Sequence, residues 1–188
     1  MAEAETNPVL EIIDHNKPVE ENKKYPGDLL QFNQTGWRAY YHCHPAARTG
    51  NHCFQCEHGH FHIFVRTQVN PEAWSHVVAL AMDNMGQPLG WFTVNHWVTG
   101  EQWQSAESLI TLLNTIPYAN QQSLIERWIL SLVALSVEEI AVILSERDKV
   151  IERHQDKSED KNIKQDKALY LLSEAAINLH ELLNLNNG

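Results

Sequence analysis

The segment from His58 to Val65 alternates histidine with large apolar residues, and this pattern constrains the fold more than any other feature of the chain. Side chains along a β-strand point to opposite faces in turn. Three histidines would therefore share one face of a strand and three apolar residues the other. The histidines are His58, His60 and His62, and the apolar residues are Phe61, Ile63 and Val65. We predict a strand with one face in the apolar core and the opposite face lined by histidines.

A second strand-like segment, Arg38–His44, carries two more histidines on one of its faces. If the two strands pair antiparallel, His42 would lie near His60 or His62, with Cβ atoms of opposed residues about 4.5–5.5 Å apart. Imidazoles so placed can bind one ion through bonds of about 2.0–2.1 Å. A shift of the strand register by one residue would turn these histidines to the opposite face of the sheet. The pattern predicts a metal site made from His42, His44, His58, His60 and His62.

The connection between these strands adds further ligand-type residues. Cys53 and Cys56 have the Cys-x-x-Cys spacing that lets two thiolates bind one ion, which is half of a zinc-finger pattern. The remaining ligands would be His52, His58 or a strand histidine. A redox dithiol and two inert thiols are the alternatives for the cysteine pair. Glu57 could be a third type of ligand, a general base, or a partner that orients a ligating histidine.

Two histidines farther along the chain, His76 and His96, stand at the ends of strand-like runs and could fold back to the same site. Hydrogen-bonded structural histidines are the alternative for both. We expect Cys43 to be a small buried residue. Nitrogen and sulfur ligands favour transition metals over Mg and Ca. The cofactor we expect is one ion of Zn, Fe or Cu.

Strands come first in the chain and helices second, which is typical of an α+β fold. The strand-like runs are Arg38–His44, His58–Arg66, Ser75–Asp83 and Leu89–His96. The helix-like runs lie within Glu101–Asn114, Ser123–Leu135, Val137–His154 and Ala168–Leu185. Short connections between the strands favour an antiparallel meander. We predict a small sheet of about four strands followed by three to four α-helices.

The length of 188 residues fits one domain with appendages. We expect residues 1–36 to be a polar N-terminal arm and residues 37–154 to be the metal-binding α+β domain. Residues 155–188 would be a linker and a C-terminal helix. The apolar stripe of that helix would pack on the domain or pair with a second chain as a homodimer.

The charge balance and the apolar pattern exclude several classes of partner. The formal net charge is −10, and the Lys and Arg residues form no cluster outside runs of mixed sign, which argues against nucleic acid. No apolar stretch reaches the length that crosses a bilayer, and the N-terminus lacks the pattern of a signal peptide. We therefore expect a cytoplasmic protein that does not bind membranes. The odd number of cysteines argues against a disulfide framework.

Four motifs, YHCH, EHGHFHIFVR, LGWFTVNHWVTGE and RWILSLVALSVEEIAVILSERD, resemble an uncharacterised bacterial family, a domain of unknown function. The similar part runs from about Trp37 to Asp148. The family pattern corresponds to His42, His44, the run Glu57–His62, Asn95 and Trp97–Thr99. The Cys53-x-x-Cys56 loop and His96 depart from it, and the resemblance implies no activity. The cupin family also has His-x-His on a strand, but Glu57 comes too late for the glutamate of its motif.

Three functions are compatible with these residues. The first is a metal-binding protein with a His-rich, or His/Cys, transition-metal site on adjacent strands. The second is a mononuclear non-heme metalloenzyme of Zn or Fe, hydrolytic or oxygenase-type, in which Glu57 moves protons on an undetermined small-molecule substrate. The third is an interaction module whose loop is stapled by structural zinc. A closed site of four ligands favours the staple, and an open site favours catalysis.

Overall fold

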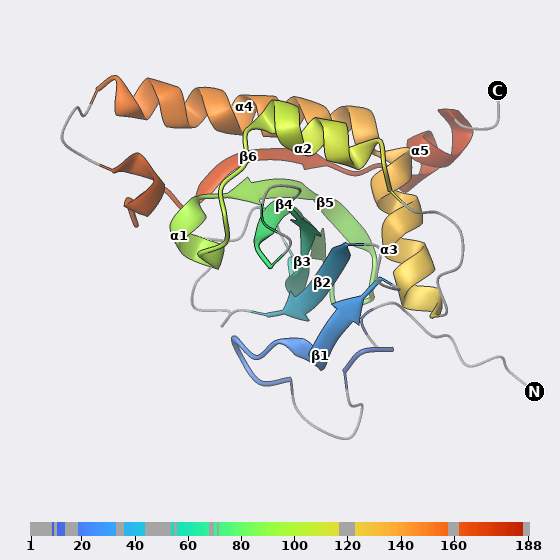
Figure 1. Ribbon diagram of the computed structural model, residues 1–188. Helices are drawn as coiled ribbons and strands as arrows, with labels where there is room; N and C mark the ends of the chain where they lie inside the picture. The colour runs from blue at the N-terminus through green and yellow to red at the C-terminus, as the bar shows by residue number, and fades with distance from the viewer. Residues whose placement is uncertain are drawn as a thin grey trace, which may run out of the picture.

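The fold is seen in a computed structural model of the chain, in which a six-stranded antiparallel sheet is combined with five α-helices (Figure 1). The structure describes residues 9, 11–13, 19–32, 36–43, 54, 56–67, 70, 72–116, 123–157 and 162–185. The strands are β1 (Tyr25–Gln31), β2 (Trp37–His42), β3 (Gly59–Arg66), β4 (Trp74–Met82), β5 (Pro88–Val94) and β6 (Leu171–Ala176). The helices are α1 (His96–Thr99), α2 (Ala106–Leu113), α3 (Leu124–Leu135), α4 (Val137–Gln155) and α5 (Leu179–Leu185), with a 3-10 turn at Ile163–Gln165.

The strands follow one another in the sheet in chain order, and every neighbouring pair is antiparallel. The predicted α+β class and the antiparallel meander are therefore confirmed. Strands β2 to β5 lie where alternation and turn residues placed the four predicted strands. All four helices from α1 to α4 fall in the single connection between β5 and β6.

The predicted strand number was wrong, because two more strands complete the sheet. Strand β1 lies in the segment predicted to be a polar arm, where it pairs with β2. Strand β6 and the short helix α5 replace the single C-terminal helix predicted over Ala168–Leu185. Without β6, β5 would present unpaired backbone groups at an edge of the sheet. Pairing with that edge outweighs a helical spacing of leucines, which is only a weak local preference.

A serine caps the first turn of α2 and another caps the first turn of α3. The Ser105 side chain accepts a hydrogen bond from the backbone N–H of Ser108 at the start of α2, and Ser123 accepts one from Glu126 at the start of α3. Such caps satisfy backbone N–H groups that have no partner within the helix. They fix where both helices start.

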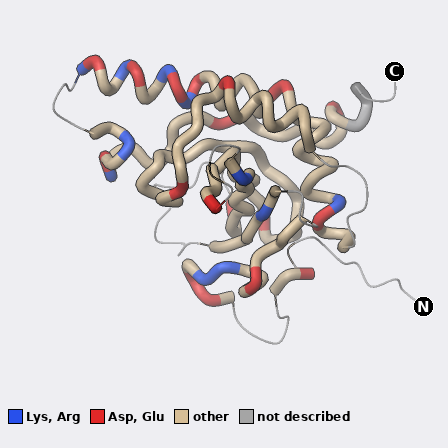
Figure 2. The backbone as a smooth tube through the Cα atoms, in the orientation of Figure 1, with Lys and Arg blue, Asp and Glu red and all other residues tan. Residues whose placement is uncertain are grey.

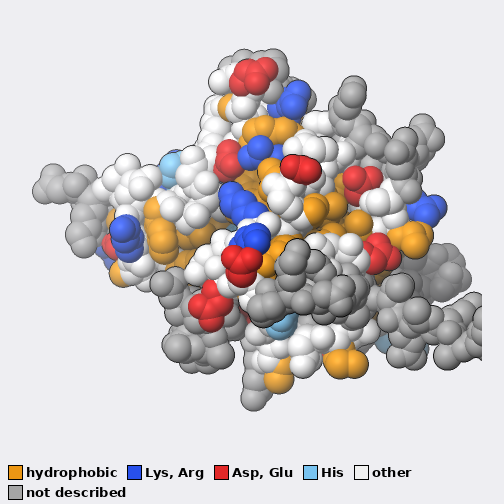
Figure 3. All heavy atoms as spheres, turned by 90° about the horizontal axis from the view of Figure 1, so that it is seen from below, with side chains coloured by type: hydrophobic (Ala, Val, Ile, Leu, Met, Phe, Trp, Pro, Cys, Tyr) orange, Lys and Arg blue, Asp and Glu red, His pale blue; other side chains and the backbone are white. Residues whose placement is uncertain are grey.

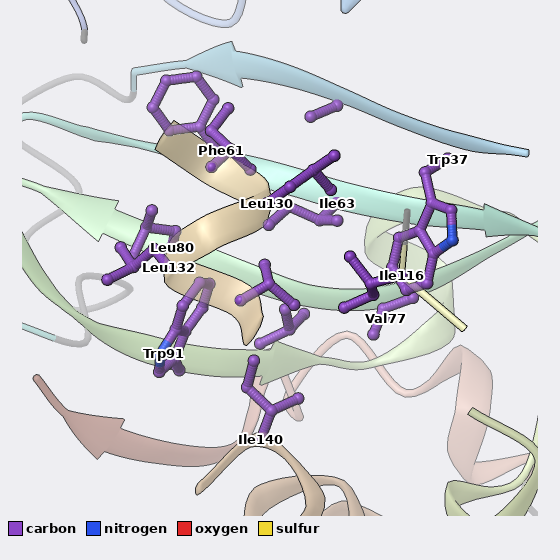
Figure 4. Close-up of a cluster of buried hydrophobic side chains, with 14 of the residues drawn as sticks. Trp37, Phe61, Ile63, Val77, Leu80, Trp91, Ile116, Leu130, Leu132 and Ile140 are labelled. Atoms are coloured by element: carbon purple, nitrogen blue, oxygen red, sulfur yellow. The ribbon is translucent and has the colours of Figure 1, made fainter. Parts of the chain in front are cut away.

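One face of the sheet packs against the helices and forms the main core (Figure 4). Strand residues Phe61, Ile63, Leu80 and Trp91 contribute side chains to it, and all are fully or almost fully buried. The helices add apolar residues, among them Leu109, Leu130, Leu132, Ile140 and Leu144. The apolar half of the β3 alternation is thus buried as predicted, and the histidine half must point the other way.

Charged residues concentrate outside the central strands. Acidic and basic side chains follow one another along α4 (Figure 2), whereas β4 and β5 contain none of either sign. On the face seen in Figure 3, acidic, basic and hydrophobic side chains are intermixed. Within the described part of the chain, no single helix has both the length and the apolar composition to cross a bilayer. Helices α3 and α4 meet that length and composition only when they are taken as one bent pair, with 72° between them.

Candidate metal centre

Strands β2 and β3 place two rows of side chains next to each other on the sheet face opposite the main core. Their antiparallel register pairs His42 with His60 and Tyr40 with His62. The prediction that His42 lies near His60 or His62 is therefore confirmed. His60 and His62 are 1% and 0% exposed, whereas His42 is half-buried. Of the three rings, that of His42 is the most exposed to solvent.

The three imidazoles lie close enough together to bind one ion. Their ligand-type nitrogens are all within 4.8 Å of one another. The two Nε2 atoms of His42 and His60 are 2.8 Å apart. In a tetrahedral site with bonds of about 2.0–2.1 Å, ligand nitrogens are about 3.3 Å apart. The closest pair would open by about 0.5 Å and the other pairs would close by up to about 1.5 Å, which side-chain rotation can supply.

A buried carboxylate fixes the orientation of one ring. Glu57 Oε1 lies 2.7 Å from His60 Nδ1, and the Glu57 side chain is 2% exposed. The carboxylate accepts this hydrogen bond, so His60 carries a proton on Nδ1 and turns Nε2 towards His42. Histidines that bind metals commonly donate their second ring N–H to a carboxylate in this way. Glu57 thus holds His60 in the tautomer that a metal ligand requires.

A fourth histidine orients the third member of the cluster. His76 on β4 lies with Nε2 at 2.9 Å from His62 Nδ1, and the two rings meet nearly edge to face. Burial, with smaller contributions from Arg147 and His60, lowers the pKa of His76 to about 3. His76 is therefore neutral at physiological pH. Because Nδ1 of His62 contacts His76, Nε2 is the nitrogen of His62 that could bind an ion.

Aromatic and small residues from three strands surround the imidazoles. The Tyr40 ring lies 5.4 Å from that of His62, and the Phe92 ring meets His60 edge to face at 5.1 Å. Burial is the main cause that raises the pKa of Tyr40 to about 12, so its hydroxyl stays protonated. Ala79 and Ala81 lie opposite His62 and His60 on β4. Their small side chains leave the space that the rings occupy.

Phe54, in the connection between β2 and β3, packs on the same face of the sheet. Its ring lies over Gly90, where an added Cβ would collide with Phe54 and with the carbonyl oxygen of Ala175. Phe54 also joins a small apolar cluster with Ala79, Ala81 and Phe92. Sequence analysis missed Phe54, Phe92 and the two alanines. Two signals pointed to them, namely the glycine inside strand β5 and the small residues on either side of Leu80.

Two of the predicted histidines lie elsewhere. Strand β3 begins at Gly59, so His58 precedes the alternating part, and its Nδ1 lies 2.6 Å from the Tyr41 hydroxyl. Burial lowers the pKa of His58, and Asp83 partly offsets this. His96 begins helix α1, and its Nδ1 lies 2.8 Å from Gln165 Nε2. Neither histidine belongs to the group of three that the described residues form.

The cysteines do not join the described cluster either. Cys56 is exposed and has a φ of 67°, a left-handed conformation in the loop before β3. Cys43 is buried as expected, and burial raises the pKa of its thiol. The remaining predicted ligands, His44, His52 and Cys53, lie outside the described residues. The pairing of Cys53 with Cys56 therefore stays a prediction.

The model of a family described as a domain of unknown function (DUF6969) matches residues 1–177, which confirms the resemblance found in the sequence. No curated protein and no solved structure matches the chain.

Proposed function

Since the chain belongs to this family of unknown function, we propose from its geometry that it is a metal-binding protein, with one transition-metal ion held by His42, His60 and His62. Glu57 and His76 would orient two of the three ligands. The single observation that carries the proposal is the convergence of three imidazoles from two adjacent strands, all within 4.8 Å. The ligand-type nitrogens of these three histidines lie close together, as those of one metal site do.

The electrostatics of the cluster favour a bound cation. Three imidazoles lie side by side, and two of them are almost completely buried. Protonating more than one would place like charges next to each other, and among the described residues Glu57 is the carboxylate in contact with them. Neutral imidazoles are the form that binds a metal ion, and the ion fixes them in that form. The cluster is therefore better suited to hold a metal than to hold protons.

The ligand set restricts the identity of the ion. Three neutral nitrogen donors suit Zn, Fe or Cu, and they do not suit Mg or Ca, which prefer oxygen. Glu57 is hydrogen-bonded to His60, and His76 contacts His62. Partners of this kind orient metal ligands and tune the properties of the bound ion. We place zinc first among the three, because three protein nitrogens in a near-tetrahedral arrangement are common in its sites.

A mononuclear metalloenzyme is the second candidate, and the open ligand count favours it. Three protein ligands leave a fourth position for water or substrate, which is the pattern of catalytic zinc sites. The half-buried His42 marks the side from which a small molecule would arrive. Because Glu57 is hydrogen-bonded to His60, its role in such a reaction would be to position that ligand, and the ion would supply Lewis-acid chemistry. The zinc-staple alternative needs a fourth ligand from the connection between β2 and β3.

Metal analysis of three proteins tests the proposal: the untagged wild type, His60→Ala and the control His154→Ala. His154 lies exposed in the last turn of α4, where its ring contacts the backbone carbonyl of Val150, and it is not part of the described cluster. We expect about one ion per chain in the wild type and in the control after loading with Zn²⁺ and dialysis, and much less in His60→Ala. Equal metal content in all three proteins, or none in any, would contradict the proposal.

Cysteine alkylation separates the open site from the staple. If Cys53 and Cys56 bind the ion, bound metal protects both thiols, and Co²⁺ substitution gives thiolate charge-transfer absorption. If the site is formed by histidines alone, both thiols react at the same rate with and without metal. We expect the second result, because Cys56 is exposed and outside the cluster. Protection of both cysteines would move the assignment to the closed structural site.

A further inference from the structure

One lysine stands next to the most exposed ring of the histidine cluster. Tyr25, the first residue of β1, pairs with Tyr41 of β2 in antiparallel register. One residue further out on each segment, Lys24 comes to lie opposite His42, which in turn pairs with His60. Opposed residues of an antiparallel pair share one face of the sheet. The Lys24 side chain therefore belongs to the face that carries the imidazoles.

The ammonium group of Lys24 lies over an aromatic ring that borders the cluster. Its Nζ atom is 4.3 Å from the centre of the Tyr40 ring. The Tyr40 ring lies 5.6 Å from that of His42 and 5.4 Å from that of His62. Lys24 Nζ is therefore within about 10 Å of both imidazoles, which is about the Debye length at 0.1 M ionic strength. Its charge acts on whatever binds at these rings.

The charge of Lys24 is not neutralised by a partner among the described residues. Lys24 is exposed, and its ammonium group forms no ion pair or hydrogen bond with any of them. Its neighbours differ in this respect, because Lys23 pairs with Glu20 and Arg38 pairs with Glu101. An ammonium group has three N–H donors and no acceptor. Lys24 can therefore pair with a ligand without giving up an existing partner.

Two carboxylates near the cluster oppose this charge in part. Glu57 is hydrogen-bonded to His60. Burial, and after it the charge of Glu21, raises the pKa of the Cys43 thiol next to His42. A divalent ion on three neutral imidazoles brings two positive charges. Together with Lys24 these exceed the two carboxylates, so an anion would reduce the excess charge and a neutral molecule would not.

We propose that the metal centre takes a small carboxylate as its ligand, and that Lys24 selects this ligand by pairing with its charge. The inference rests on the proposed metal site and adds the class of molecule that the site receives. A carboxylate has two oxygens, of which one suits the ion and the other accepts a hydrogen bond from an ammonium group. The flexible four-carbon stem of lysine allows Lys24 to move from the Tyr40 ring to such a ligand.

The test follows the binding of acetate to the Co²⁺-loaded protein by its visible absorption, at an ionic strength fixed with perchlorate at about 0.1 M. We expect acetate to change the spectrum saturably. Lys24→Gln should weaken acetate about two- to fivefold, the range of an exposed ion pair, and Lys24→Arg should keep the wild-type affinity. The matched control is Lys23→Gln, which removes the same charge from the next residue, whose ammonium group pairs with Glu20. It should leave the affinity for acetate within about twofold of the wild type.

The cobalt content is measured first, so that failure of the metal site is seen separately. A chain that takes up no cobalt would contradict the metal site, and the carboxylate site with it. Cobalt uptake without any response to acetate would contradict the carboxylate site alone. Equal affinity of the wild type and Lys24→Gln, or equal losses in Lys24→Gln and Lys23→Gln, would overturn the role of Lys24.

Discussion

The two faces of the central strands are built from neighbouring residues and have opposite chemistry. On β4, Leu80 is buried in the main core, while Ala79 and Ala81 on either side of it lie opposite the imidazoles of β3. The core face is filled by large apolar side chains that pack against helices. The histidine face is filled by rings with specific nitrogen contacts, and small residues make room for them. Both faces are buried at their centre, so burial alone does not distinguish them.

The comparison shows which face tolerates change and which does not. A core responds mainly to lost or added volume, and other apolar residues of similar size can replace its members at modest cost. The histidine face depends on which ring atom points where, through contacts such as Glu57 to His60 and His76 to His62. Substitutions on the first face should therefore change stability, and substitutions on the second should change metal binding.

Leu80→Ala should give the largest effect on the core side of the comparison. Leu80 is 0% exposed, and removing its side chain leaves a cavity between β4 and the helices. We expect the free energy of unfolding to fall by about 2–5 kcal/mol in urea titrations. The metal content per folded chain should stay near that of the wild type. Loss of metal from folded Leu80→Ala would show that the two faces are not independent.

Metal itself should stabilise the protein through the histidine face. Zn²⁺ at about 100 times its dissociation constant should raise the free energy of unfolding by about 2.7 kcal/mol, provided that the unfolded chain does not bind it. His42→Ala should lose most of this increment, since His42 is one of three ligands and is half-buried, so its removal disturbs packing little. Thermal unfolding with and without Zn²⁺ measures the increment.

The control for this experiment is the variant His58→Ala. His58 lies directly before Gly59, the first residue of β3. Its imidazole contacts the Tyr41 hydroxyl and lies outside the cluster, so the variant should keep the increment from Zn²⁺ even if its metal-free stability falls. The same increment in His42→Ala and in the wild type would show that His42 is not a ligand.

Much of this site could be predicted from local alternation. His60 and His62 share a face because both lie inside a regular strand, and one antiparallel hairpin then brings His42 to them. His58 does not lie in the group of three described histidines, because alternation holds only within the strand and β3 begins at Gly59. The contributions of Ala81 and Phe92 depend on the register of β3, β4 and β5, and no pattern within one segment determines such a register.

The two ends of the sheet were missed for a similar reason. Strand β1 is a polar segment and β6 has the spacing of a helix, so neither shows the alternation that identified the central strands. Each becomes a strand because a neighbouring strand offers an edge of backbone groups to pair with. The fold class was predictable, since the central strands and the helices have strong patterns, whereas edge pairing depends on the assembled sheet.

Glu57→Gln tests the contact that orients the ligand His60, rather than a ligand itself. The amide keeps the shape of the side chain and can still accept a hydrogen bond from His60, but it removes the negative charge. We expect the affinity for Zn²⁺ to fall by about 10- to 100-fold, the usual effect of losing such a partner. Competition with a chelator of known affinity measures this. The exposed Glu72→Gln is the control, because it changes the net charge equally.

An unchanged affinity in Glu57→Gln would mean that the hydrogen bond, and not the charge, supports His60. Glu57→Leu would then distinguish the two, because it removes the hydrogen bond as well. If Glu57→Leu also binds Zn²⁺ as tightly as the wild type, the assignment of Glu57 as a positioning residue is wrong.

The apolar core residues contribute no pH dependence of stability, whereas His76 on the histidine face should contribute one, and this is the smallest of the expected effects. The pKa of His76 is lowered to about 3 in the folded protein, against about 6.5 in an unfolded chain. Below pH 6.5 the unfolded chain therefore binds a proton that the folded metal-free protein excludes, so stability falls as the pH falls towards 3. One such group contributes at most about 1.4 kcal/mol per pH unit. His76→Phe should reduce this slope between pH 6 and pH 5 by about that amount.

Leu80→Ala should lower stability at every pH and keep the slope of the wild type, since no titrating group is lost. Urea titrations of metal-free protein at several pH values measure both slopes, and a wild-type slope in His76→Phe would show that His76 is not the group that resists protonation.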